Sequence, residues 1–115
     1  MKSQNTIVIS IRNSKAVAKA QAEGNLVYIG RAMRYSFDAF VRTGSKWANP
    51  FNIGPTCTRE ESLVLYADYL MGRQDLLDAI PELRGKVLAC WCKPEFACHG
   101  DILAKWANEG IPKNE

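Results

Sequence analysis

Thiol and imidazole groups are concentrated in one short stretch of this 115-residue chain. Three of the four cysteines and the single histidine lie between Lys86 and Gly100, in the sequence KVLACWCKPEFACHG, which we call the cysteine stretch. Both groups act as nucleophiles or proton acceptors, and both bind soft or borderline metal ions. The types and spacing of these residues support three interpretations, which assign different chemistry to the same side chains.

The first interpretation is a metal site. Zinc and iron–sulfur clusters take sulfur and imidazole ligands, and four such ligands lie close together in the sequence: Cys90, Cys92, Cys98 and His99. Their spacing, C-x-C-x5-C-H, departs from the usual C-x2–4-C pairs. Adjacent Cys98 and His99 would also have difficulty reaching one tetrahedral ion together. We therefore expect either no cofactor, or a zinc ion or iron–sulfur cluster held by these four residues.

The second interpretation is a catalytic or redox thiol. Cys98 directly precedes a predicted helix, where the partial positive charge of unpaired amides favours a thiolate. His99 beside it can add charge or accept a proton, and Cys90 or Cys92 can act as a resolving thiol. Under this interpretation Cys98 is the nucleophile, and the predicted catalytic residues are Cys98, His99 and Cys90.

The third interpretation is purely structural. Cys90 and Cys92 then act as small buried hydrophobic residues, and the turn at Cys98 and His99 only starts a helix. Cys57 lies apart in a polar loop, and we expect no role for it. The sequence alone leaves the three interpretations open.

A second region, between Asn25 and Gly54, carries an excess of positive charge. It holds four basic residues and one acid, Asp38, so its net charge of +3 equals that of the whole chain. The basic residues are Arg31, Arg34, Arg42 and Lys46. Such a surface suits a phosphate-bearing ligand, a nucleotide or a nucleic acid, although a solvated basic loop has the same composition.

The sharpest prediction of a binding site in this region is the sequence KWANPF from Lys46 to Phe51, which we call the KWANPF segment. Its lysine and Asn49 can contact a phosphate or a polar ring edge beside the indole of Trp47. The aromatic side chains can instead anchor the loop to the core, which we expect of Phe40 and Phe51. The predicted ligand-binding residues are Arg31, Lys46, Trp47, Asn49 and Lys93.

These groups need a scaffold to position them, and the chain predicts strands interleaved with helices. β-Branched and apolar runs predict strands at Thr6–Arg12, Asn25–Ala32 and Lys86–Cys92, the first of them buried. Periodicity and capping residues predict helices at Lys15–Glu23, Thr58–Met71, Asp75–Leu83 and His99–Asn108. We therefore expect residues 1–115 to form a single α/β domain with a mainly parallel sheet flanked by helices. Ligands collect at the carboxyl ends of such strands, where Cys90 and Cys92 would lie.

Composition and missing motifs exclude several classes of protein. A hydrophobic content of 47% and a charged content of 23% are typical of a soluble globular chain. No apolar run reaches the roughly 18–20 residues that span a bilayer, and Ile7–Ile11 is too short for a signal-peptide core. We therefore expect a cytoplasmic protein without a membrane partner. The chain has no Walker-type loop, G-x-G-x-x-G, nucleophile elbow or H-E-x-x-H motif.

Five segments carry a resemblance to a known family. They are VYIGRA at Val27–Ala32, SKWANPF at Ser45–Phe51, TREE at Thr58–Glu61, ELRGK at Glu82–Lys86, and CWCKP with CHG between Cys90 and Gly100. Their order and spacing resemble those of the small bacterial and phage proteins grouped as domain of unknown function 4326. Ala48 departs from the pattern, which commonly has glycine there. The resemblance implies that the KWANPF segment and the cysteine stretch face each other across one pocket.

The C-terminal part is also similar in layout to another family with a Rossmann-like α/β fold, which implies a small Rossmann-like domain. Together these patterns lead us to expect a nucleotide- or nucleic-acid-directed protein, with the KWANPF segment and Arg31 holding phosphate and base. The cysteine stretch would then supply thiol- or metal-dependent chemistry. The alternative is a non-catalytic binder, such as a phage protein that sequesters a nucleotide signal or a host partner. The sequence leaves open whether the chain is an enzyme and how many copies assemble.

Overall fold

The computed structural model describes residues 5–31, 33, 44–51, 55, 57–91 and 98–111. Strands and helices alternate along these residues, as the sequence predicts. The strands are β1 (Ile7–Ser10), β2 (Leu26–Tyr28) and β3 (Val87–Cys90). The helices are α1 (Ser14–Glu23), α3 (Arg59–Met71), α4 (Gln74–Ala79), the 3₁₀ helix η1 (Ile80–Leu83) and α5 (His99–Glu109). The described chain therefore forms an α/β fold.

The sheet is three-stranded and parallel, with the order β1-β3-β2. Ile7 of β1 and Leu26 of β2 both pair with Val87, so the two outer strands run in register with the central β3. Parallel strands place their carboxyl ends at one edge of the sheet. This confirms the predicted parallel sheet, while the finer Rossmann-like assignment stays a prediction.

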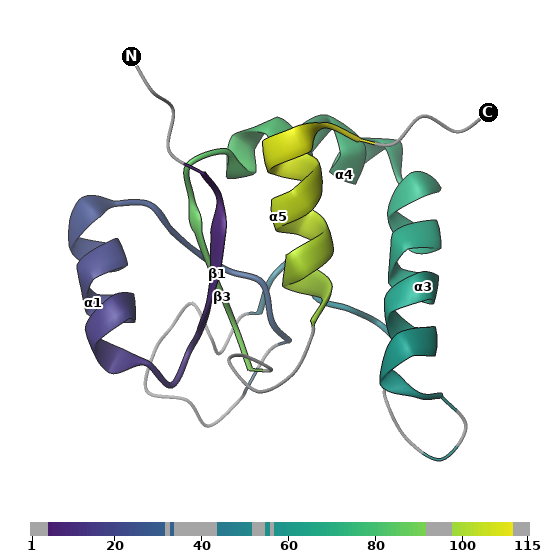
Figure 1. The fold of residues 1–115 in the computed structure, drawn as a ribbon, viewed down its shortest axis with the longest axis horizontal. Coiled ribbons are helices and arrows are strands. Elements are labelled where there is room, and N and C mark those ends of the chain that lie inside the picture. Colours follow the sequence, from purple (N-terminus) through teal and green to yellow (C-terminus); the bar gives the residue numbers. More distant parts are fainter. Residues whose placement is uncertain are drawn as a thin grey trace.

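Side chains alternate between the two faces of the sheet, and each face packs against different elements. Val8, Ile29 and Leu88 belong to the larger core, which includes residues of α3, α4, η1 and α5. Tyr28 and Ala89 belong to a smaller cluster on the opposite face. Figure 1 shows α1 and α5 on opposite sides of the strands, with α3 beyond α5. The larger core therefore lies on the α5 side.

Local sequence signals account for where the helices begin. Asn13 accepts a hydrogen bond from the Ala16 amide at the start of α1. The predicted capping box at α3 is present: Thr58 Oγ1 accepts from the Glu61 amide at 3.1 Å, and Glu61 Oε1 accepts from the Thr58 amide at 2.9 Å. These bonds satisfy amides that have no partner within the helix.

The prediction of a buried strand at Thr6–Arg12 is wrong in part. The strand covers only Ile7–Ser10, and in the described sheet it lies at an edge, next to β3 alone. Ile7 is 50% exposed, whereas Leu88 of the central strand is fully buried. A neighbour on only one side covers the side chains of an edge strand less well.

Among the described residues, no helix is long and apolar enough to cross a membrane.

Candidate functional site

A cavity of about 430 Å³ lies at the carboxyl ends of the strands. Gly30 and Arg31, which follow β2, and Trp91, which follows β3, line it together with Cys98 and His99 at the start of α5. In Figure 1, α5 begins at the lower end of the sheet, where β3 ends. The cavity therefore occupies the place where ligands collect in parallel α/β sheets.

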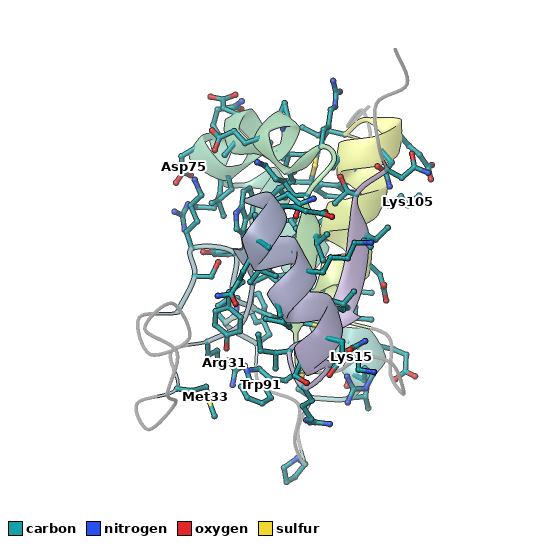
Figure 2. The ribbon with its side chains drawn as sticks, turned by 90° about the vertical axis from the view of Figure 1, so that its left-hand side faces the viewer. Lys15, Arg31, Met33, Asp75, Trp91 and Lys105 are labelled. Carbon is teal, nitrogen blue, oxygen red and sulfur yellow. The ribbon has the colours of Figure 1, made fainter. Side chains whose placement is uncertain are left out.

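The opposite wall comes from the KWANPF segment and from α3. Asn49 and Phe51 line the cavity from the segment, and Arg59, Ser62 and Leu63 line it from the first turns of α3. The structure thus brings together four of the predicted site residues: Arg31, Asn49, Cys98 and His99. Figure 2 shows Arg31, Met33 and Trp91 at one end of the molecule, far from Asp75 and Lys105.

Cys98 is held in place as the N-cap residue of α5. Its Sγ accepts a hydrogen bond from the Gly100 amide at 3.2 Å, and its own amide donates to Asp101 Oδ2 at 3.0 Å. The Gly100 amide is one of the helix-terminal donors that favour negative charge. The thiol is buried, but it lines the cavity. Cys98 therefore lies both at the helix start that the sequence predicts and in the wall of the cavity.

Gly100 lets the start of α5 approach the sheet closely. A Cβ at this position would lie 2.6 Å from Cδ1 of Ile29 and 3.0 Å from Cγ1 of Val8. Real Cβ atoms do not tolerate contacts as short as the first. The glycine of the CHG motif is therefore a packing requirement for placing Cys98 and His99 above β1 and β2.

Cys90 lies directly behind Cys98. The two Sγ atoms are 3.1 Å apart, both thiols are buried, and neither is part of a disulfide. Cys90 does not belong to the residues that line the cavity. Only Cys98 of this pair is thus presented to a ligand. Cys92, the other predicted resolving thiol, lies outside the described residues.

His99 is 8% exposed, and its Nε2 lies 2.7 Å from the carbonyl oxygen of Ile29. A carbonyl oxygen can only accept, so Nε2 carries the proton and Nδ1 is the basic nitrogen of the neutral ring. Burial lowers the pKa of His99, the bond to Ile29 opposes that shift, and nearby Arg31 lowers the pKa further. His99 is therefore neutral near pH 7. Of the two predicted roles, this favours accepting a proton over adding charge.

The positive charge of the cavity comes from two arginines. Nε and Nη2 of Arg31 donate to the Asn49 carbonyl at 3.1 and 3.0 Å, which ties the end of β2 to the KWANPF segment. Arg59 lines the cavity from the first turn of α3. No acidic side chain belongs to the described lining. The sequence did not single out Arg59, because its place on a predicted helix indicates only that its side chain faces solvent.

Asn49 organises the KWANPF segment through its side chain. Oδ1 accepts from the Phe51 amide at 2.9 Å, and Nδ2 donates to Ser62 Oγ at 2.9 Å. Ser62 Oγ in turn donates to the Phe51 carbonyl at 2.7 Å. The ligand contact of Asn49 stays a prediction: its side-chain amide holds the turn around Pro50 against α3, and the residue lines the cavity from there.

The prediction that Trp47 and Lys46 contact a ligand gains no support from this cavity. Trp47 is only 3% exposed and belongs to the core, and its carbonyl accepts a hydrogen bond of 2.6 Å from Tyr66. Lys46 Nζ lies over the Trp47 ring, 5.4 Å from its centre, and neither residue lines the cavity. Phe51, expected as a core anchor, lines the cavity instead. The indole is the larger apolar group, and it lies in the core cluster together with Tyr66 and Leu70 of α3.

Trp91 lines the cavity, although the sequence did not single it out. Its side chain belongs to the cluster opposite α5, as strand alternation predicts, yet its ring reaches the cavity. Nε1 donates to Tyr28 Oη at 2.7 Å, and that hydroxyl donates to the Arg31 carbonyl at 2.7 Å. A Cβ on Gly30 would overlap the Tyr28 ring. Gly30 thus leaves room for the Tyr28 ring, and the Arg31 carbonyl accepts the hydroxyl of the same tyrosine, which in turn binds Trp91.

Three of the four predicted metal ligands, Cys90, Cys98 and His99, lie among the described residues. Among those residues, no three histidine, cysteine or acidic side chains lie together so as to hold a metal ion. Cys92, the fourth predicted ligand, and Lys93, a predicted ligand-binding residue, lie outside them. Nε2 of His99 is also engaged by Ile29. A zinc ion or an iron–sulfur cluster at these residues stays a prediction.

Comparisons with known proteins agree with the resemblance to this family. The sequence model of a family described as domain of unknown function 4326 matches residues 11–109. An uncharacterised protein of Acanthamoeba polyphaga mimivirus is 36% identical over 84 residues, which cover 67% of this chain and 62% of the viral protein. The chain thus matches less than two thirds of that relative's length. No solved structure matches the chain. Because the family match spans nearly all of the sequence, the chain belongs to the domain of unknown function 4326 family.

Proposed function

We propose that the cavity binds a phosphate-bearing ligand of the nucleotide class. One observation carries the proposal: Arg31 and Arg59 approach the same cavity from opposite walls, and no acidic side chain belongs to its described lining. Guanidinium groups donate charged hydrogen bonds to phosphate oxygens, and Arg31, whose Nε and Nη2 bind the Asn49 carbonyl, still brings its positive charge to the cavity. The amides at the start of α5 add positive partial charge, which the Asp101 carboxylate in the same turn partly offsets.

The rest of the lining suits the base and sugar of such a ligand. Phe51 and Trp91 offer aromatic surface, and Leu63 and Met33 offer apolar surface. Aromatic rings stack on nucleic-acid bases largely independently of base identity. A volume of about 430 Å³ falls within the range of small-molecule sites. These features favour a single nucleotide over a duplex nucleic acid.

Calorimetric titration with ATP, ADP and AMP, and with adenosine as the phosphate-free reference, tests the proposal. The nucleotides should bind and adenosine should bind more weakly. Arg31→Gln and Arg59→Gln should each lower nucleotide affinity by about tenfold to a hundredfold, because each removes a charged hydrogen-bond donor. Trp91 lines the cavity, whereas Trp47 and Trp106 are buried, so tryptophan fluorescence gives a second readout.

Arg73→Gln is the matched control. Arg73 is exposed and pairs with Asp75, and it does not line the cavity. This variant removes the same charge and should leave nucleotide affinity unchanged. Equal losses of affinity in the Arg31, Arg59 and Arg73 variants would show that the net charge of the protein, and not the cavity, causes the effect. Binding of adenosine as tight as that of ATP would contradict phosphate recognition.

A second candidate function, turnover of the bound ligand by a thiol, is favoured by Cys98, which lines the same cavity and whose Sγ accepts a hydrogen bond from the Gly100 amide. Cys98→Ser should then abolish turnover while nucleotide affinity stays within about threefold of the original. In a non-catalytic binder the parent protein shows no turnover, and the same variant still binds. Chromatography of the nucleotide after incubation distinguishes the two.

A further inference from the structure

Cys90 and Cys98 form a pair that nucleotide binding does not explain. One thiol ends β3 and the other caps α5, and their Sγ atoms lie 3.1 Å apart in the interior. A disulfide bond is about 2.05 Å long, so the sulfurs need to approach by only about 1 Å to bond. The pair therefore joins two elements without a large rearrangement.

We propose that Cys98 and Cys90 form a reversible disulfide, with a hydroperoxide as the oxidant and Cys98 as the residue that it attacks first. The assignment of roles follows from access. Cys98 lines the cavity, whereas Cys90 lies behind it and does not. A small oxidant that enters the cavity meets Cys98, and the sulfenic acid formed there lies beside the second thiol.

The environment of Cys98 supports the nucleophilic role. The Gly100 amide donates to Sγ at 3.2 Å, which stabilises a thiolate more than a thiol. The Asp101 carboxylate opposes this effect, but it accepts the Cys98 amide at 3.0 Å, so its charge is partly neutralised by that bond. His99, with its Nε2 committed to Ile29, adds a neutral ring to the same wall.

The proposed steps balance in atoms and electrons. The Cys98 thiol first loses its proton. The thiolate then attacks one peroxide oxygen, the O–O bond breaks, and the hydroxide that leaves takes up that proton, which gives a sulfenic acid and water. Cys90 Sγ then attacks the Cys98 sulfur, the S–O bond breaks, and the hydroxyl leaves as water with the Cys90 proton. Two thiols and hydrogen peroxide thus yield one disulfide and two waters. A dithiol reductant restores both thiols by exchange.

Mass spectrometry of the whole chain after stoichiometric hydrogen peroxide tests this directly. Remaining thiols are blocked with iodoacetamide before digestion with chymotrypsin, which can cleave after Trp91 and after Phe96. These two cuts place Cys90, Cys92 and Cys98 on separate peptides. We expect one disulfide that joins the Cys90 and Cys98 peptides and that disappears with dithiothreitol. A disulfide to Cys92, or no disulfide at all, would overturn the proposal.

Variants separate the two roles. Cys90→Ala keeps a small apolar side chain in the core and should trap the Cys98 sulfenic acid, which dimedone labels. Cys98→Ser should lose both the label and the disulfide. Cys57→Ser, remote from the pair in sequence and only partly buried, should behave as the parent chain. Dimedone labelling of Cys90 rather than Cys98 would reverse the assignment and contradict the proposal. None of these readouts needs a nucleotide, so they stand apart from the test of the proposed function.

Discussion

Nε2 of His99 donates a hydrogen bond of 2.7 Å to the carbonyl oxygen of Ile29, seventy residues earlier in the chain. This bond joins the end of β2 to the first turn of α5, and both partners are buried. The Tyr66 ring packs edge-on against the imidazole, with ring centres 5.0 Å apart. His99 therefore links three elements around the cavity, and its replacement should affect both stability and pH response.

We expect His99→Phe to lower the free energy of unfolding by about 1–3 kcal/mol. The phenyl ring retains the aromatic packing against Tyr66, but the buried Ile29 carbonyl loses its donor. Urea denaturation followed by circular dichroism measures the difference. His99→Ala, which also leaves a cavity, should cost more than His99→Phe. An equal loss in both variants would assign the effect to shape and not to the hydrogen bond.

The stability of the parent chain should fall as the pH drops below about 6.5, the ordinary pKa of histidine. Burial lowers the pKa of His99 in the folded state, so the unfolded chain binds the extra proton first. The stabilisation is thus complete above pH 6.5 and is lost as the pH falls toward the folded pKa. Urea midpoints between pH 8 and pH 5 measure this loss, and His99→Phe should remove it.

Carboxylates respond in a separate, more acidic window. The backbone amide of Thr58 lowers the pKa of Glu61, and the Arg73 side chain lowers that of Asp75. Their contributions are present above pH 4.5 and are lost only as the pH falls below it. A loss of stability between pH 6.5 and pH 5 that survives in His99→Phe would contradict the assignment to histidine.

Gly100→Ala should destabilise the fold by about 1–3 kcal/mol, because its Cβ would press on Ile29 and Val8. Gly72→Ala is the matched control. Gly72 has a φ of −90°, and a Cβ there would meet only the carbonyl oxygens of Asp68 and Tyr69, at 3.7 and 3.6 Å. This variant should change the free energy of unfolding by no more than about 0.5–1 kcal/mol. Thermal unfolding of the two variants side by side measures the contrast.

Tyr66→Phe should cost about 1–3 kcal/mol of unfolding free energy, because the buried carbonyl of Trp47 loses its hydrogen-bond donor. Tyr69→Phe removes a hydroxyl from the same helix, one that instead accepts a hydrogen bond from Arg73 at an exposed position. That control should cost less than about 0.5 kcal/mol. Urea denaturation measures the loss of unfolding free energy in each of the two variants. A similar small loss in both variants would show that α3 does not hold the KWANPF segment through Tyr66.

The features that the sequence predicted well depend on neighbours in the chain. The capping box of Thr58 and Glu61 spans three residues, and the start of α5 at Cys98 follows from a change of periodicity nearby. Strand composition and interleaved helices were enough to predict a parallel sheet. Its carboxyl edge then indicated where a site would form. These predictions needed no knowledge of which side chains meet across the fold.

The features that the sequence missed depend on contacts between distant segments. Trp47 and Phe51 are both aromatic and only four positions apart. Residue type alone could not predict which of the two side chains would be buried in the core. Tyr66 donates to the Trp47 carbonyl and Asn49 binds Ser62, and through these long-range contacts α3 holds the segment with Trp47 in the core and Phe51 at the cavity. The closeness of Cys90 and Cys98 likewise follows from how α5 packs against β3, which residue spacing does not specify.

The strand order has a consequence for how this chain folds. β1 and β2 do not pair with each other, because β3 lies between them, and Ile7 pairs with Val87. During synthesis the first two strands therefore leave the ribosome without a partner, and the sheet closes only after β3 has emerged. Such long-range pairing slows folding and leaves strand edges exposed to other chains until it is complete. The last third of the sequence thus controls when the fold forms as well as where the cavity lies.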